Sequence, residues 1–320
     1  MAFITDRNTA KGIFEDAARR DVSIALFCTG SFWNTEAILL AASRYAKRHG
    51  IENIPVVIAM TSLYSHMQQV TRVTYSRDAK FGLRAVLEYA RMLSEGPYAP
   101  YPNVAVMTHL DHAHPDTDKW ALENNTDLLT SVMFDAQTLP YEENVKRTKE
   151  YVRQYGDQIL VEGIIESLAV GDGTDASQRD DYIEKAVEFI AETGVDFLVA
   201  DLGTEQQSSG TEAHYLKARA RALTAALGRR MIVLHGVSSM KNEDIRGLAA
   251  DGVIRVNMWT RIVRESGQYA ARRLAERLPL IEANDFEAAE ATAYINDNIE
   301  EAARVMEIVM DGLGYANLAK

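Results

Sequence analysis

The sequence contains one cysteine, Cys28, so the 320-residue chain cannot hold an internal disulfide framework. Basic residues are also few: 34 Lys and Arg stand against 46 Asp and Glu, and they form no cluster that would attract nucleic acid or an anionic membrane. No apolar run approaches the roughly 18 residues of a membrane span, and charges interrupt the start where a signal peptide would be apolar. These absences favour a cytoplasmic protein that acts on small molecules, with no nucleic-acid or membrane partner.

Short apolar, β-branched runs alternate with amphipathic helical patterns along the chain. Because the runs are apolar on both faces, they predict the α/β class, as a parallel (β/α)8 TIM barrel with additional C-terminal helices. An open doubly wound sheet is the alternative, but the turn "FCTGSFWNTEA" lacks the G-x-G-x-x-G pattern expected after its first strand. The eight predicted strands span residues 22–27, 54–60, 104–110, 128–134, 158–165, 197–203, 231–236 and 253–258.

Three predicted helices have both ends marked by capping residues. They run from Pro140 to Gly156, from Ser177 to Gly194 and from Asn242 to Gly252. Further helices are predicted beyond the eighth strand, and these exceed what a barrel needs. We therefore expect a barrel domain over residues 1–282 and a helical extension over 283–320. The extension has to pack on the barrel or on a second subunit, which favours a homo-oligomer.

The chemistry of barrel enzymes lies at the C-terminal ends of the strands. The stretch "THLDHAHPD" follows the third predicted strand, and His235 follows the seventh. Neutral imidazoles from different strands can share a divalent ion, so His112 and His235 form the predicted metal-binding pair. Along an extended strand Asp111 would point away from His112, which leaves its carboxylate available as a base. A strand-end histidine can also be merely structural, and for His109 and His114 supporting roles are the alternative to ligation.

With these residues in place, the chain resembles the class II, metal-dependent ketose-bisphosphate aldolases that act on fructose and tagatose bisphosphates. The resemblance rests on "HLDHAH", "TSVMFDAQTLPYEENVKRTKEYV", "TGVDFLVADLGT" and "IVLHGVSSMKNEDIRGLAADGVIRVNM", and it spans most of the chain. It implies a barrel in which a divalent ion, usually zinc, polarises a ketone. It also implies that Asp111 transfers the proton at the reacting carbon, while His112 and His235 bind the metal.

The metal site departs from the family pattern at its third histidine. Gln206 stands where the family has this ligand, and Glu205 or Glu166 are candidate replacements. Glu162 keeps the first glutamate of the family's Val-Glu-Ala-Glu-Leu-Gly strand, whereas the second is Ile164. Because oxygen ligands favour harder ions, manganese or another divalent ion is an alternative to the zinc that the resemblance implies.

The substrate site departs as well. Trp259 replaces an aspartate of the family's Asn-x-Asp-Thr motif and adds a large apolar surface. Arg255 and Arg261 flank this motif and are candidates to hold a phosphate, carboxylate or sulfonate. The residues expected at the substrate are Gly203, Gly236, Ser238, Asn257, Trp259, Thr260 and Arg261.

Three functions remain open on sequence grounds. The first is metal-dependent aldol or retro-aldol cleavage of a sugar or anionic sugar derivative through an enediolate. The second is an isomerase or epimerase that uses the same proton abstraction beside a metal-bound ketone. The third is a non-catalytic, aldolase-like subunit that has lost a ligand; the joint presence of Asp111, His112 and His235 speaks against it.

Overall fold

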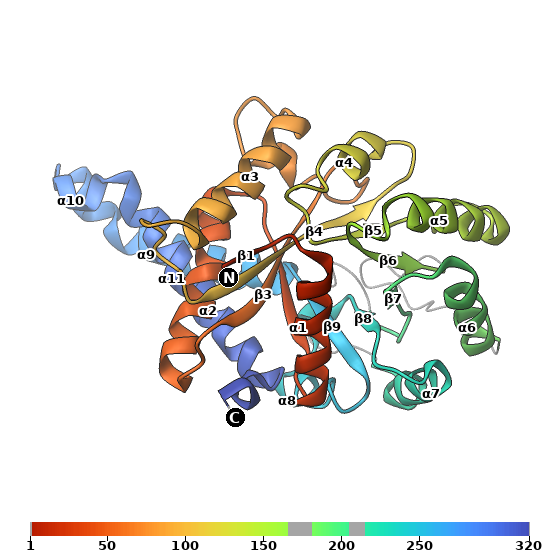
Figure 1. Cartoon of the computed structure of the whole chain (residues 1–320). Helices are drawn as coiled ribbons and strands as arrows, with labels where there is room; N and C mark the ends of the chain where they lie inside the picture. Colours follow the sequence, from red (N-terminus) through yellow and green to blue (C-terminus); the bar gives the residue numbers. More distant parts are fainter. Residues whose placement is uncertain (1, 166–180, 205–214, 320) are drawn as a thin grey trace.

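The computed structural model describes residues 2–165, 181–204 and 215–319, which form a barrel of parallel strands surrounded by helices (Figure 1). From β2 to β9 each strand pairs with its neighbours in chain order, and the barrel closes where β2 pairs with β9. This confirms the predicted TIM barrel. Its strands are β2 (Ile24–Cys28), β3 (Ile54–Thr61), β4 (Val104–Ala113), β5 (Ser131–Phe134), β6 (Leu160–Ile164), β7 (Phe197–Val199), β8 (Ile232–Leu234) and β9 (Val253–Met258).

The barrel strands are buried on both faces, as in β3, where all eight residues are buried. Aliphatic and β-branched side chains suit such strands because they pack both inside the barrel and against the helices outside. The predicted strands overlap the observed ones, although β7 and β8 are three residues long. One strand was not predicted: β1 (Phe3–Ile4) pairs in parallel with Val106 and Met107 of β4. Two residues are too few to show a strand pattern in sequence.

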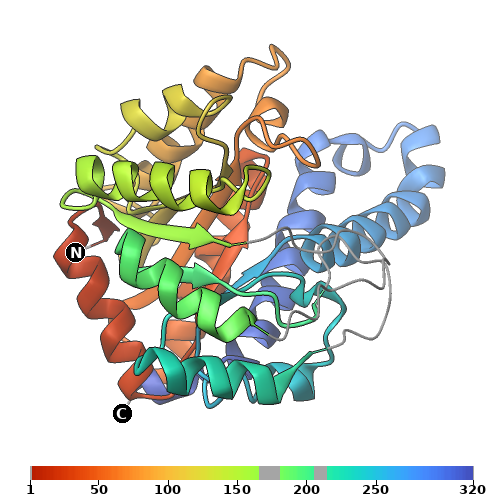
Figure 2. The same cartoon turned by 90° about the vertical axis from the view of Figure 1, so that its right-hand side faces the viewer.

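Helices cover the outside of the barrel between successive strands (Figure 2). The predicted ends hold for α5, which stops before Gly156, and for α6, where Gly194 closes the helix with a φ of +73°. Glycine suits that position because it adopts a left-handed conformation without strain. These helices are α1 (Arg7–Arg19), α2 (Phe32–His49), α3 (Ala79–Ser94), α4 (Lys119–Asn124), α5 (Tyr141–Tyr155), α6 (Tyr182–Thr193), α7 (Lys217–Leu227) and α8 (Asn242–Ile245).

The predicted helix from Asn242 to Gly252 is wrong beyond its first turn. α8 ends at Ile245, and the following residues form consecutive turns in which the Leu248 N–H bonds the Ile245 carbonyl at 3.3 Å. Gly252 ends this segment with a φ of +99°, and a Cβ there would lie 1.9 Å from Oγ1 of Thr224 in α7. The close approach to α7 therefore requires glycine at this position. The predicted start of the preceding helix, Ser177, lies outside the described residues.

The chain ends in α9 (Thr260–Glu282), α10 (Phe286–Ala289), α11 (Ala291–Gly312) and the short helix η3 (Tyr315–Ala319). α11 packs on α2 and α9, and its Ala302, Met306 and Met310 are fully buried (Figure 1). The extension thus packs on the barrel of its own chain, while the division into domains at residue 282 stays a prediction. No helix among the described residues is long and apolar enough to cross a membrane.

Candidate active site

Asp111 and His112 lie near the C-terminal end of β4, where the pairing with β5 shifts register between Leu110 and Ala113. His112 has a φ of +48°, in the left-handed region that non-glycine residues rarely adopt. An irregularity of this kind redirects side chains that regular alternation would separate. The expectation that Asp111 and His112 point apart is therefore wrong, since both line the same cavity.

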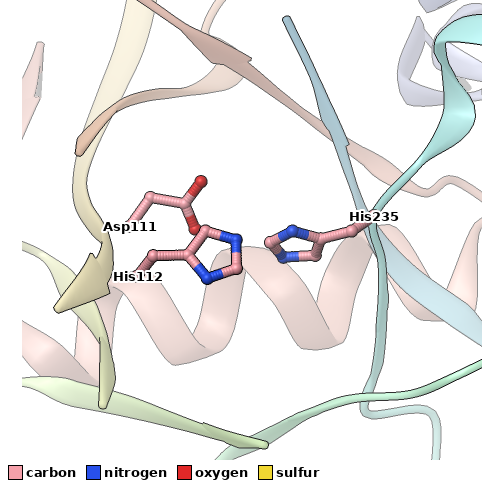
Figure 3. Close-up of side chains that lie close together, drawn as sticks. All are labelled: Asp111, His112 and His235. Carbon is pink, nitrogen blue, oxygen red and sulfur yellow. The ribbon is translucent and has the colours of Figure 1, made fainter. Parts of the chain in front are cut away.

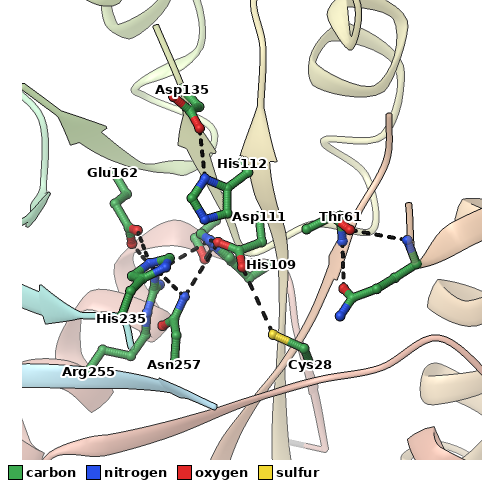
Figure 4. Close-up of polar contacts among 12 residues, drawn as sticks. Cys28, Thr61, His109, Asp111, His112, Asp135, Glu162, His235, Arg255 and Asn257 are labelled. Carbon is green, nitrogen blue, oxygen red and sulfur yellow. Dashed lines mark hydrogen bonds and ion pairs between the residues drawn. The ribbon is translucent and has the colours of Figure 1, made fainter. Parts of the chain in front are cut away.

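His112 is held by the carboxylate of Asp135, which follows β5. Its Nδ1 lies 2.7 Å from Oδ2 of Asp135, so Nε2 is the ring nitrogen suited to bind a metal (Figure 4). The imidazole of His235 faces it edge-on, with ring centroids 5.0 Å apart and ring planes at 80° (Figure 3). The structure thus brings together the two histidines that the sequence paired across more than a hundred residues.

His235 follows β8 and is only 5% exposed. Its Nε2 lies 2.9 Å from Nδ2 of Asn257 on β9, and Thr204 donates a hydrogen bond of 2.6 Å to its carbonyl. Burial lowers the pKa of His235 to about 4. The ring is therefore neutral at pH 7, which is the state that binds metal.

The Asp111 carboxylate lies beside both histidines and is 4% exposed. Burial alone would raise the pKa of Asp111, but the charge of His112 and the hydrogen bond from His109 outweigh burial and lower it below its usual range. Oδ1 of Asp111 also lies 3.4 Å from Nδ2 of Asn257, and Oδ2 lies 4.0 Å from Sγ of Cys28. This residue is thus an ionised carboxylate at neutral pH, held ready to accept a proton.

A buried ion pair between Arg255 and Glu162 lies inside the barrel next to these groups (Figure 4). Both side chains are fully buried, and burial lowers the pKa of Arg255 to about 9. His109 continues the network, with Nε2 3.4 Å from Nη2 of Arg255 and Nδ1 2.8 Å from Oγ of Ser131. Arg255 therefore neutralises a carboxylate within the barrel instead of facing substrate. The carboxylate belongs to Glu162, the glutamate that this chain shares with the strand motif described above.

The cavity above Asp111 has a volume of about 70 Å³. Of the predicted substrate residues, Gly203 does not line it; its N–H bonds Oδ1 of Asp201 at 3.0 Å. Arg261 does not line it either, because its guanidinium bonds Glu265 at 3.0 Å and Asn242 at 2.9 Å. Those that do line the cavity are Gly236, Ser238, Asn257, Trp259 and Thr260.

Several lining residues were missed by the sequence reasoning. Cys28 and Thr61 end strands β2 and β3, a position that could have singled them out. Tyr64, Met67 and Gln69 lie on the loop after β3, which has no periodic pattern to reveal its path.

His114 is not among the described residues that line the cavity. Its Nδ1 accepts from the Asp116 N–H at 3.2 Å, and its Nε2 lies 3.4 Å from Oγ1 of Thr138 on the loop after β5. Gln206, Glu205 and Glu166, the candidates for the third metal ligand, lie outside the described residues.

The residues present fit a divalent metal ion. Asp111, His112 and His235 each offer a ligand atom, and these atoms lie within 4.8 Å of one another in buried surroundings. Oδ1 of the neighbouring Asn257 and Oε1 of Glu162 are buried without a hydrogen-bond partner among the described residues. Two imidazoles with nearby oxygen atoms form a donor set suited to zinc or manganese.

A family model described as fructose-bisphosphate aldolase class-II matches residues 8–317 of the chain. Fructose-bisphosphate aldolase of Streptococcus pneumoniae is 35% identical over 170 residues, which cover 49% of this chain and 53% of that protein. The Streptococcus pyogenes aldolase is 33% identical over the same length. The chain thus spans about half the length of the curated relatives that it matches.

Solved aldolase structures share the fold over nearly the whole chain. Fructose-bisphosphate aldolase from Campylobacter jejuni has a TM-score of 0.76 at 16% identity and covers 98% of this chain and 96% of that chain. The YdjI aldolase from Escherichia coli K12 has a TM-score of 0.66 at 19% identity, covering 96% and 95%. At these identities the likeness establishes the architecture.

Proposed function

The chain belongs to the class II fructose-bisphosphate aldolase family, and from this premise we propose that it cleaves or forms a carbon–carbon bond in a sugar derivative, with a divalent metal ion as cofactor. The observation that carries the proposal is the meeting of Asp111, His112 and His235 in one buried cavity. A carboxylate beside two imidazoles joins a base to metal ligands, the combination that aldol chemistry at a ketone needs.

His112 and His235 would hold the ion, with Asp135 and Asn257 orienting the two rings. The family resemblance favours zinc, and manganese is the alternative if an oxygen ligand takes the place of the third histidine. When bound, a divalent ion polarises the ketone of the substrate.

Asp111 would carry the proton. In the condensation direction its carboxylate would accept the proton from the carbon next to the ketone and pass it to the oxygen of the aldehyde. In the cleavage direction it would accept the proton of that hydroxyl and deliver it to the carbon next to the ketone. Its carboxylate is ionised at neutral pH, because its pKa lies below its usual range, and it therefore has no proton of its own. The amide of Asn257, 3.4 Å from Oδ1, fixes the direction of the carboxylate.

The substrate is proposed to be a sugar or an anionic sugar derivative that differs from the common hexose bisphosphates. The indole of Trp259 forms one wall, and among the described lining residues none is Lys or Arg. An anionic group would therefore bind to backbone N–H groups and to the hydroxyls of Ser238 and Thr260. A cavity of about 70 Å³ also favours a substrate with a small group beside Asp111.

We further propose a homo-oligomer in the cytoplasm. Exposed apolar side chains on α9 and α10, among them Leu278 and Phe286, support self-association. The single cysteine, Cys28, is buried as a free thiol, in keeping with a reducing compartment.

The deciding experiment compares the parent protein with Asp111→Asn, using Asp157→Asn on an exposed position as the matched control. Metal content is measured by elemental analysis, and products from a panel of sugar phosphates and sugar acids are identified by NMR. We expect Asp111→Asn to keep its fold and its metal but to lose turnover by about 10²-fold or more. Asp157→Asn should behave as the parent.

Turnover that survives in Asp111→Asn would refute the role of this carboxylate. Products that keep the carbon chain intact would show that the protein is an isomerase or epimerase and not a lyase. A purified protein that contains no metal and ignores added zinc and manganese would refute the enzymatic proposal as a whole.

A further inference from the structure

The ring of Tyr64 lies flat against the imidazole of His112. The ring centroids are 4.2 Å apart and the planes differ by 7°, which is a parallel stack. Tyr64 is half-buried and lines the cavity together with His112. The function proposed above gives this aromatic residue no task.

The loop that carries Tyr64 is held at both ends. The Thr61 N–H donates to Oε1 of Gln69 at 2.9 Å, and the Gln69 N–H donates to Oγ1 of Thr61 at 3.2 Å (Figure 4). Between them the Leu63 N–H donates at 2.9 Å to Asp118, which is fully buried. Tyr64 is therefore placed on His112 by a hydrogen-bonded loop and is not a freely rotating surface side chain.

The His112 ring needs such support because the torsion about its Cβ–Cγ bond has broad, shallow minima. The hydrogen bond to Asp135 restrains one edge of the ring at Nδ1. The contact with His235 is T-shaped, with ring planes at 80°, so His235 does not stack flat on the imidazole. A flat aromatic partner resists rotation of the imidazole, since turning the ring would break the stack.

We propose that Tyr64 is a positioning residue of the metal site: its ring, and not its hydroxyl, holds the His112 imidazole in the orientation that binds the ion together with His235. The inference rests on the proposed function only in requiring that a divalent ion binds at His112. It applies with particular force here because His112 and His235 are the two imidazoles of the Asp111–His112–His235 cluster among the described residues.

The test measures binding of Co²⁺ alone to metal-free protein, by competition with a chelating indicator and by the visible absorption of the bound ion. Tyr64→Phe keeps the ring, and Tyr64→Leu removes it at similar apolar volume. The matched control is Tyr75→Leu, on a fully exposed side chain. We expect Tyr64→Phe and Tyr75→Leu to bind Co²⁺ within about twofold of the parent. Tyr64→Leu should bind at least about tenfold more weakly and with an altered spectrum.

Equal affinity and an equal spectrum in Tyr64→Leu would overturn the proposal, and so would weakened binding in Tyr64→Phe, which would assign the role to the hydroxyl. Guanidinium unfolding of each metal-free variant checks the fold; if leucine disrupts the loop, Tyr64→Met makes the same comparison. Failure of the parent protein to bind Co²⁺ would count against the proposed function. If the parent binds Co²⁺ and Tyr64→Leu binds it equally well, only the inference about Tyr64 is refuted.

Discussion

The Arg255–Glu162 pair is the most costly group of residues in the barrel to bury. Both side chains are 0% exposed, and Nε and Nη1 of Arg255 have no hydrogen-bond partner among the described residues. Removing such charges from water costs several kcal/mol per ion, and their attraction offsets this only while both partners remain. The intact pair therefore contributes little net stability, but loss of either partner destabilises the fold. The pair thereby couples Glu162 of β6 to Arg255 of β9.

Glu162→Gln is expected to destabilise the metal-free protein by about 3 to 5 kcal/mol, because it leaves the Arg255 cation buried without an anion. Guanidinium unfolding measures the loss. The control is Asp127→Asn, which breaks an exposed pair with Arg84 at 2.7 Å and should cost less than about 1 kcal/mol. Similar losses at the two positions would contradict the account of Arg255 as an uncompensated buried charge.

His109 should make stability fall in mild acid. Burial first, and then the charge of Arg255, lowers its pKa to about 3 from a value of 6.5. Between these values the unfolded chain binds the extra proton, so this contribution to stability is complete above pH 6.5 and declines as pH falls toward 3. The expected loss from His109 is about 2 kcal/mol between pH 7 and 5, seen in unfolding curves at several pH values.

His109→Gln removes this titrating group and should flatten the pH dependence in that range. His66→Gln, at an exposed imidazole, is the matched control and should leave the slope unchanged. An unaltered slope in His109→Gln would show that other groups cause the acid sensitivity.

The sequence predicted which histidines meet because barrel closure places all strand ends at one mouth, whatever their separation in the chain. It also predicted Asp111 as the base at this site, but regular alternation predicted a different direction for its side chain, and the register shift in β4 brings it into one cavity with His112. The position of Tyr64 could not be predicted from the sequence either. Hydrogen bonds to Gln69 and Asp118 set the path of its loop, and no residue pattern indicates these hydrogen bonds.

At the scale of elements, the C-terminal η3 is joined to the barrel through one hydroxyl. Tyr315 is fully buried; its Oη accepts from the Ala25 N–H at 2.8 Å and donates to the Pro55 carbonyl at 2.9 Å. Ala25 belongs to β2 and Pro55 to β3, so the hydroxyl bridges the two strands where they begin. The end of the chain is thereby part of the barrel's hydrogen bonding.

Tyr315→Phe should destabilise the protein by about 2 to 4 kcal/mol, because it leaves one buried N–H and one buried carbonyl without a partner. Tyr98→Phe, on an exposed side chain, serves as the control and should leave the guanidinium midpoint unchanged. If the two variants unfold at the same midpoint, the bridge contributes nothing and η3 merely rests on the barrel.

Apolar runs of six to eight residues predicted the eight barrel strands. Shorter elements, and elements that depend on their surroundings, were not predicted correctly. β1 has two residues and exists through its pairing with β4, and the turns after α8 end at Gly252, which packs closely against Thr224 of α7. Both outcomes depend on contacts between distant segments, which local periodicity does not contain.

At the scale of the whole molecule, α9 and α10 extend away from the barrel (Figure 1). They carry apolar side chains that are exposed to solvent. Arg277 of α9 pairs with Asp297 of α11 at 2.5 Å, which fixes the arm against its neighbour. Beyond that pair the exposed apolar residues, with their exposed fractions, are Leu278 (50%), Leu280 (52%) and Phe286 (81%). A patch of this kind on a rigid arm favours contact with a second copy of the chain.

The oligomer prediction is tested by sedimentation of the parent and of the double variant Leu278→Ser, Phe286→Ser. The parent is expected to sediment above the 35.6 kDa of one chain, and the double variant to dissociate at least about tenfold more readily, because polar side chains remove the apolar contact. Met92→Ser, which removes a 69% exposed side chain from α3, is the matched control and should leave the association unchanged. A parent that sediments as a single chain would refute the oligomer, while an oligomer that persists in the double variant would move its interface away from α9 and α10.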